Sequence, residues 1–230
     1  MKRTTMLLSP QATDSEISSL PFKRVSVDSN ASILTDIYQA DVNIVIWENK
    51  LSHQILNDIN QIMLTTERLN IKFTAAPDDV EQALKDCADV LQDKPSLYCH
   101  IALLTDMFCT LFDLKRVGVR LAILDNAMCP KFHVDKVPCR LITTLYGVAT
   151  EWLTNHKVDR SKLGAGSLGL PDEISGIIES DQDIKKMTTG DVILLKGEGW
   201  YNNENGGAVH RSPAISKNER RLLLTLDFIE

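Results

Sequence analysis

The segment Cys129-Pro-Lys-Phe-His-Val-Asp-Lys-Val-Pro138 contains the triplet that decides the predicted fold, His133-Val134-Asp135. If the segment is a strand, its two-residue period places the imidazole of His133 and the carboxylate of Asp135 on the same face. Two potential metal ligands then point toward one place. A single His-x-Asp triplet is a weak signal, so its meaning depends on residues elsewhere in the chain.

The last forty residues contain the second part of the pattern. Residues 190–195 read as a turn into a short apolar strand, and a loop rich in Gly and Asn leads from there to His210. Arg220 and Arg221 begin the final apolar run, 10 and 11 residues after His210. Two histidines and one carboxylate are the ligands of the facial triad, which holds non-haem Fe(II) and leaves coordination positions open.

The order of these elements resembles the Fe(II)/2-oxoglutarate-dependent dioxygenases, whose fold is a double-stranded β-helix (a jelly roll). The resemblance covers about residues 117–228. Four segments of the chain are also similar to a bacterial family catalogued as domain of unknown function 1826. They are Cys129–Asp135, Leu194–Glu198, His210–Pro213 and Arg220–Asp227. That family name implies no activity.

The dioxygenase resemblance implies a role for each residue of the pattern. His133, Asp135 and His210 would be the catalytic Fe(II) ligands, and Arg221 or Arg220 would bind the distal carboxylate of the cosubstrate 2-oxoglutarate. A planar guanidinium suits this task because it grips a carboxylate through two parallel hydrogen bonds.

Strand alternation allows only one of the two arginines to point into the barrel. Arg221 shares its face with Thr225 and Asp227, whereas Arg220 shares its face with leucines, so we prefer Arg221 for the polar interior. The Arg-x-Ser pairing of some of these enzymes is absent, because Leu222 follows Arg221 and Leu223 comes next. This departure affects the expectation of 2-oxoglutarate more than that of the metal.

Other residues near the triplet have two interpretations each. Arg140, Thr144 and Tyr146 share a strand face and could hold the cosubstrate or orient the ligands, but structural pairing explains them equally well. Cys129 and Cys139 flank His133-Val134-Asp135 and suggest a zinc site with thiolate ligands, although unpaired cysteines are usually small buried hydrophobes.

The loop 198–207 would border the metal site because it precedes His210. Trp200, Tyr201 and Asn202 could meet the substrate there, or the loop could be a simple connection. The remaining histidines lack an acid or cysteine at ligand spacing and are interpreted as surface or core residues. They are His53, His100 and His156. Motifs for nucleotide hydrolysis and serine-type catalysis are absent.

Composition places the chain among ordinary globular proteins and excludes some functions. The 230 residues include 25 Lys and Arg against 31 Asp and Glu, a net charge of -6. General nucleic-acid binders are usually basic, so we expect no such partner. The five cysteines are widely spaced and read as reduced thiols, and no apolar window approaches a membrane span. We therefore expect a cytoplasmic protein without a membrane partner.

The distribution of apolar, polar and turn-forming residues along the sequence predicts an α+β protein in three parts. Residues 1–40 are expected to be an arm that is loosely ordered or draped over the body, and residues 41–116 a helix-rich α/β support region. Residues 117–230 are expected to form the double-stranded β-helix core, with an insertion at about 154–187. In this prediction the jelly roll lies in the C-terminal half, and the N-terminal region packs on it.

Hydrophobic periodicity predicts the individual elements. Helices are expected near 55–63, 77–91 and 95–114, with Cys87 in the core. Strands are expected at 42–47, 71–74, 119–125, 132–137, 140–145, 191–195, 208–211 and 221–228.

The leading hypothesis is an Fe(II)/2-oxoglutarate-dependent oxygenase that oxidises an unknown substrate, a small molecule or a protein. One alternative is a zinc- or iron-binding protein that uses the same three ligands without turnover. A second alternative is an interaction module in which Asp135, Arg140 and Arg211 form a structural polar network. The sequence leaves the oligomeric state open.

Overall fold

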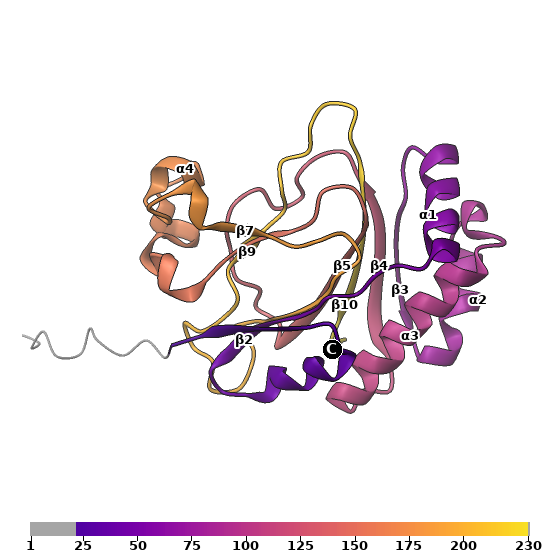
Figure 1. Ribbon diagram of the computed structural model, residues 1–230, viewed down its shortest axis with the longest axis horizontal. Helices are drawn as coiled ribbons and strands as arrows, with labels where there is room; N and C mark the ends of the chain where they lie inside the picture. The colour runs from indigo at the N-terminus through magenta and orange to yellow at the C-terminus, as the bar shows by residue number, and fades with distance from the viewer. Residues whose placement is uncertain (1–21, 230) are drawn as a thin grey trace, which may run out of the picture.

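Two β-sheets face each other in the computed structural model, which describes residues 22–229 (Figure 1). The large sheet has the strand order β1-β2-β8-β5-β10-β4-β3 and the small sheet the order β7-β6-β9. The strands of the large sheet are β1 (Arg24–Asp28), β2 (Val42–Trp47), β3 (Asn70–Ala75), β4 (Val117–Leu124), β5 (Cys139–Tyr146), β8 (Val192–Lys196) and β10 (Arg221–Asp227). Those of the small sheet are β6 (Glu151–Leu153), β7 (Ile184–Lys186) and β9 (His210–Arg211).

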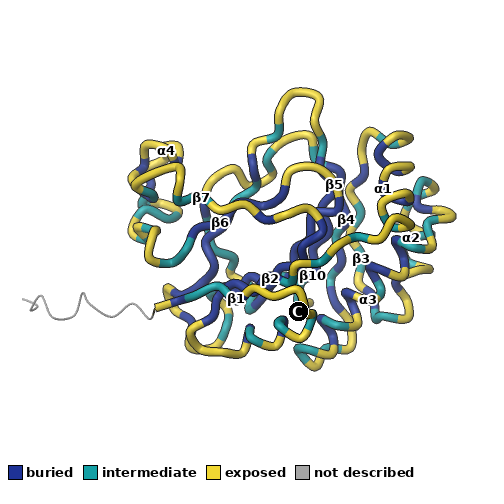
Figure 2. The backbone as a smooth tube through the Cα atoms, viewed as in Figure 1, coloured by how far each residue is buried: buried dark blue, intermediate teal, exposed yellow. Residues whose placement is uncertain are grey.

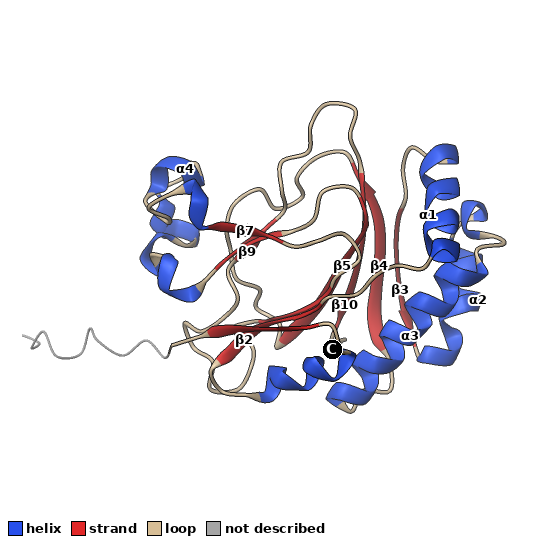
Figure 3. Cartoon of the chain, viewed as in Figure 1, coloured by secondary structure: helices blue, strands red, loops and turns tan. Residues whose placement is uncertain are grey.

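Helices cover the outer face of the large sheet, away from the small sheet (Figures 1 and 3). They are α1 (His53–Thr65), α2 (Val80–Cys87), α3 (Pro95–Phe112) and the 3-10 helix η2 (Ala31–Tyr38). The short α4 (Asp172–Ser175) lies beyond the small sheet. The other 3-10 turns are η3 (Pro77–Asp79), η4 (Asp89–Leu91), η5 (Asn155–Lys157), η6 (Arg160–Lys162), η7 (Gly164–Ser167) and η8 (Asp181–Asp183).

Strand alternation divides the apolar residues of the large sheet between two cores. Leu194 of β8 faces the helices and packs in the outer core with Phe108 of α3. Its neighbour Ile193 faces inward and packs with Trp152 of β6, between the two sheets. Buried positions follow the central strands, as Figure 2 shows. Inward-facing side chains of the large sheet therefore look toward the small sheet.

Helix α3 confirms the predicted periodicity of its apolar face. It begins at Pro95, whose fixed φ suits the first helical turn, and ends before Asp113 in the left-handed conformation (φ 52°). Leu97, Ile101 and Leu104 are fully buried against the sheet. Its length and apolar composition would also suit a membrane span, but its buried face makes it a core helix of this fold.

His100 of α3 is a core residue, as expected, and gives the fold a specific acid sensitivity. Burial lowers its pKa from 6.5 to about 4, and its Nε2 has no hydrogen-bond partner in the part of the chain that the structure describes. The unfolded chain takes up this proton below pH 6.5 while the folded chain does not, so stability falls as the pH drops toward 4. We expect the titration of His100 to lower the free energy of unfolding by about 2–3 kcal/mol between pH 7 and pH 4.5.

The variant His100→Leu checks this expectation. Urea denaturation should show nearly unchanged stability at pH 7 and a smaller loss at pH 4.5 than in the wild type. Equal losses in both proteins would show that other groups cause the acid sensitivity.

Residues 22–40 are ordered and pack on the body of the protein, so the second of the two expectations for the arm holds and loose order does not. Strand β1 pairs in parallel with β2, and η2 buries Leu34 and Ile37 in the outer core. Asn30 caps η2 through its side chain, which accepts a hydrogen bond from the backbone N–H of Ser32. Ser- and Asp-rich sequence here marks caps and turns and not disorder. The rest of the predicted arm, residues 1–21, lies outside the described residues.

The fold is a mixed α/β arrangement whose large sheet extends beyond the C-terminal half. Strands β1, β2 and β3 precede residue 117 and are part of the same sheet as β5, β8 and β10. The predicted insertion 154–187 ends in β7, which pairs with β6. Cys87, expected in the core, is exposed, because α2 ends at this residue.

Candidate metal site

Three side chains from distant parts of the chain converge between the two sheets. One ligand atom from each of His133, Asp135 and His210 can be chosen so that all lie within 4.8 Å of one another. The Asp135 Oδ1 lies 3.9 Å from the Nε2 of His133, and its Oδ2 lies 3.6 Å from the Nε2 of His210. The two imidazole centroids are 4.5 Å apart. The structure thus brings together the three residues that the sequence pattern predicted as ligands.

Backbone pairing fixes the two histidines next to each other. His133 and His210 form an isolated antiparallel bridge, and His210 lies opposite Trp152 of β6. Residues directly opposite each other project to the same face of a sheet. Both imidazoles therefore share the inward face of the small sheet with Trp152, which packs in the core between the sheets.

The predicted strand 132–137 is wrong, because only His133 pairs as in a sheet. Beyond it the chain turns toward the loop after β8, and the carbonyl of Asp135 accepts a hydrogen bond from the N–H of Glu198 at 2.9 Å. A Cβ on Gly197 would lie 2.0 Å from the carbonyl oxygen of Val137, so this close approach requires glycine. The convergence of the ligands results from this turn and not from strand alternation.

The hydrogen bonds of the imidazoles leave one nitrogen of each ring free toward the carboxylate. The Nδ1 of His133 lies 2.9 Å from the carbonyl oxygen of Lys131, and the Nδ1 of His210 lies 3.1 Å from that of Ala208. A carbonyl only accepts, so each Nδ1 donates, and in the neutral ring Nε2 then carries the lone pair. Burial lowers the pKa of His210 to about 4, which keeps it neutral. Neutral imidazoles with a fixed tautomer are suited to metal binding.

Arg140 orients the carboxylate of the site. Its Nη1 donates to Asp135 Oδ2 at 2.9 Å, and its Nε donates to Asp227 Oδ1 at 2.6 Å. The guanidinium thus holds the Asp135 carboxylate through Oδ2, and Oδ1 stays available as a metal ligand. Of the roles that the sequence left open for Arg140, the structure shows pairing with the two carboxylates.

Arg221 is a buried cation without an acidic partner in the described part of the chain. It is 1% exposed on the inward face of β10, and burial lowers its pKa to about 10. Its Nη2 donates to the hydroxyls of Thr144 and Thr150, at 2.9 and 3.1 Å. Among residues 22–229, its Nε and Nη1 have no partner, and neither does the buried Nε1 of Trp152. Unpaired buried donors are costly, and an anion would satisfy those of Arg221.

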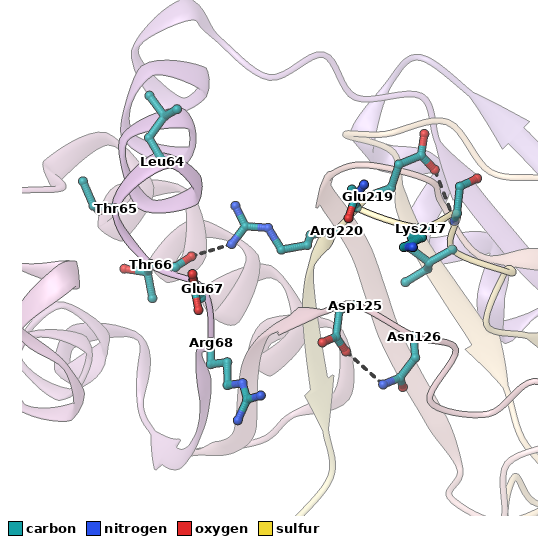
Figure 4. A pocket seen from close by; sticks show the side chains of 13 residues that line it. Leu64, Thr65, Thr66, Glu67, Arg68, Asp125, Asn126, Lys217, Glu219 and Arg220 are labelled. Atoms are coloured by element: carbon teal, nitrogen blue, oxygen red, sulfur yellow. Dashed lines mark hydrogen bonds between the residues drawn. The ribbon is translucent and has the colours of Figure 1, made fainter.

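Arg220 and Tyr146 lie elsewhere. Arg220 donates to the carbonyl oxygens of Met63 and Thr66 at the end of α1, as Figure 4 shows for Thr66. There it lines an open pocket of about 850 Å³ beside the loop 215–219. Tyr146 is 40% exposed and lines a second pocket together with Arg220. Of the two arginines, Arg221 is the one with free donors in the interior.

The thiolate-zinc interpretation does not fit the structure. Cys139 packs in the outer core, on the helix side of the large sheet, and burial raises the pKa of its thiol strongly. Neither Cys139 nor Cys129 belongs to the candidate ligand group.

The structural network expected for Asp135, Arg140 and Arg211 does not include all three residues. Arg211 pairs with Glu151 at 2.8 Å and with Asp172 at 3.0 Å, so it is not in one network with Asp135.

The loop after β8 contributes packing and not ligands. Trp200 stacks edge-on against Tyr38 and Phe112 on the helix side, with ring centroids 5.5 and 6.0 Å apart. Tyr201 is 86% exposed, and Asn202 adopts a positive φ of 54°. Left-handed backbone is typical of Asn in turns, so Asn202 occupies a turn position of the loop.

Sequence reasoning missed Thr150, Trp152 and the role of Asp227. Trp152 lies in β6, a strand of 3 residues that is too short for an alternation signal. Thr150 precedes that strand and reaches Arg221 only through the fold. Asp227 shares a face of the predicted final strand with Arg221, and this position could have suggested that Asp227 pairs with Arg140.

Comparisons with solved structures agree with this architecture. The structure is similar to a dioxygenase for auxin oxidation from rice, with a TM-score of 0.51 and 11% identity over 85% of this chain and 76% of that chain. It is also similar to dioxygenase for auxin oxidation 1 from Arabidopsis thaliana in its 2-oxoglutarate complex, with a TM-score of 0.49 and 10% identity over 90% and 92%. At 11% identity the rice structure shows a shared fold alone.

No curated protein sequence matches the chain. A family model does match, over residues 28–227, and it therefore includes the first half that the sequence motifs had left unmatched. The chain belongs to the family described as protein of unknown function DUF1826.

Proposed function

We propose that this chain is a non-haem Fe(II)/2-oxoglutarate-dependent oxygenase. The observation that carries the proposal is the convergence of His133, Asp135 and His210 within 4.8 Å on the inner side of a jelly roll. Two imidazoles and one carboxylate are a donor set that suits Fe(II) and leaves positions for a chelating keto acid and for oxygen. The bound metal would supply oxygen activation coupled to oxidative decarboxylation of the keto acid.

The residues around the triad have separate tasks in this proposal. Lys131 and Ala208 hold the imidazole tautomers through their carbonyl oxygens, and Arg140 holds the Asp135 carboxylate. Arg221 would bind the distal carboxylate of 2-oxoglutarate with the Nε and Nη1 donors that have no partner. Burial of Arg221 excludes water from this ion pair, which strengthens it.

An anaerobic titration with two matched ligands tests the proposal. The wild type with Fe(II) is expected to develop a visible charge-transfer band with 2-oxoglutarate and none with glutarate, which lacks the keto group that chelates the metal. Admission of oxygen should then yield succinate. A metal-bound protein that makes no succinate would instead be the non-catalytic metal-binding protein, and a protein that retains no stoichiometric metal would contradict both.

A further inference from the structure

A groove adjoins the candidate metal site on the inner face of the large sheet. It measures about 430 Å³, within the size range of sites for small molecules, and crosses β3, β4, β10 and β5. Arg140 and Asp227 line one end of it. Since Arg140 donates to Asp135, the groove begins directly behind a proposed metal ligand.

Two cations face each other across the floor of this groove. Lys72 of β3 lies directly opposite Arg120 of β4, and Arg120 lies opposite Thr225 of β10. Like charges at directly opposite positions of an antiparallel pair destabilise a sheet. The arrangement therefore has a cost that an anion in the groove would remove.

Both cations lack a neutralising partner in the described part of the chain. The carboxylates of Asp135 and Asp227 are already paired with Arg140, at 2.9 and 2.6 Å. Arg120 is held by neutral acceptors only, because its Nε donates to Asn70 Oδ1 at 3.2 Å and its Nη1 lies 2.8 Å from the Met128 sulfur. A thioether is a weak acceptor. The Arg120 guanidinium is thus oriented but not neutralised.

The groove is also open at its centre because of a glycine. Gly118 lies opposite Asp227 in β10 and Thr74 in β3, two residues before Arg120 on the same strand face. A Cβ on Gly118 would make only ordinary contacts, the nearest at 3.4 Å from Ile229, so the backbone does not require glycine here. A longer side chain at this position would instead fill the groove.

The geometry points to this groove as the substrate subsite of the proposed oxygenase, one that takes a small organic acid whose carboxylate pairs with Arg120 and Lys72. The role of the groove as a substrate subsite rests on the proposed function, whereas the binding of an organic acid in it does not. A planar guanidinium matches a carboxylate, and the net charge of -6 repels extended polyanions from the protein as a whole.

Ligand-observed NMR with matched acid and amide pairs tests the assignment. The probes are benzoate, phenylacetate and 4-phenylbutyrate, each compared with its uncharged amide, in the presence of Zn(II) and saturating 2-oxoglutarate. At least one acid is expected to bind about tenfold or more tightly than its amide. The double variant Lys72→Gln/Arg120→Gln should lose this preference, and Gly118→Leu should weaken acid and amide alike.

The control is Lys50→Gln/Lys94→Gln, which removes the same charge from lysines outside the groove and should keep the preference. The assignment is overturned if no acid is preferred over its amide in the wild type, or if Lys72→Gln/Arg120→Gln keeps the preference. It is also overturned if that variant loses affinity for 2-oxoglutarate, because the groove would then bind the cosubstrate. Metal content of the same samples reports separately on the proposed function.

Discussion

Replacing Arg221 with methionine is expected to weaken 2-oxoglutarate binding by about 30-fold or more. Its guanidinium lies beside Thr144 and Thr150 in the interior and keeps two donors without a partner among the described residues. Removing one partner of a buried ion pair costs about 2–5 kcal/mol of binding free energy. The measurement is calorimetric titration of 2-oxoglutarate into the Zn(II)-loaded protein, which reports affinity without turnover.

The same variant should show no loss of stability in the absence of 2-oxoglutarate. A buried charge without a counterion destabilises the folded state, and an apolar side chain of similar length removes that penalty. We expect the urea midpoint of Arg221→Met to equal or exceed that of the wild type. A purely structural arginine would give the opposite pattern, with lower stability and unchanged affinity.

Arg220→Met is the matched control on the neighbouring residue. Arg220 donates to the carbonyl oxygens of Met63 and Thr66, so its loss leaves the end of α1 without these hydrogen bonds. We expect about 1 kcal/mol lower stability and unchanged affinity for 2-oxoglutarate. Reversed results for the two variants would assign the cosubstrate to Arg220 and contradict the proposal.

Single alanine substitutions of His133, Asp135 and His210 should each remove stoichiometric metal. Loss of a group that only supports a ligand typically costs about 10–100-fold in metal affinity, and loss of a ligand should cost more. Elemental analysis of untagged protein after dialysis against a weak chelator measures the effect. His156→Ala is the control, because His156 is exposed and does not belong to the candidate group. Variants that all keep one metal per chain would show that the ion binds elsewhere.

Sequence periodicity predicted the regular elements well because burial repeats along them. Strand β2 coincides with the predicted 42–47, and α3 begins at the predicted Pro95. It failed where structure depends on contacts distant in sequence. Strand β1 has an irregular burial pattern and owes its place to pairing with β2, and the 2-residue β9 is set by its neighbours.

The residue types of the candidate site could be predicted from the sequence, but the backbone arrangement that brings them together could not. The order of His133, Asp135, His210 and Arg221 indicated the donor set, but the strand expected at 132–137 does not form. Likewise Thr150 and Trp152 approach the interior only because the short β6 pairs with β9. Alternation along one strand cannot reveal such partners, since they come from the other sheet.

The isolated bridge between His133 and His210 has a thermodynamic consequence. Two backbone hydrogen bonds, of 3.0 and 3.1 Å, hold together positions that are separated by most of the C-terminal half. An ion shared by both imidazoles would act as a removable cross-link that closes this long stretch of chain. Since a clip across a long loop restricts the unfolded ensemble most, metal supply would govern the lifetime of the protein against proteolysis.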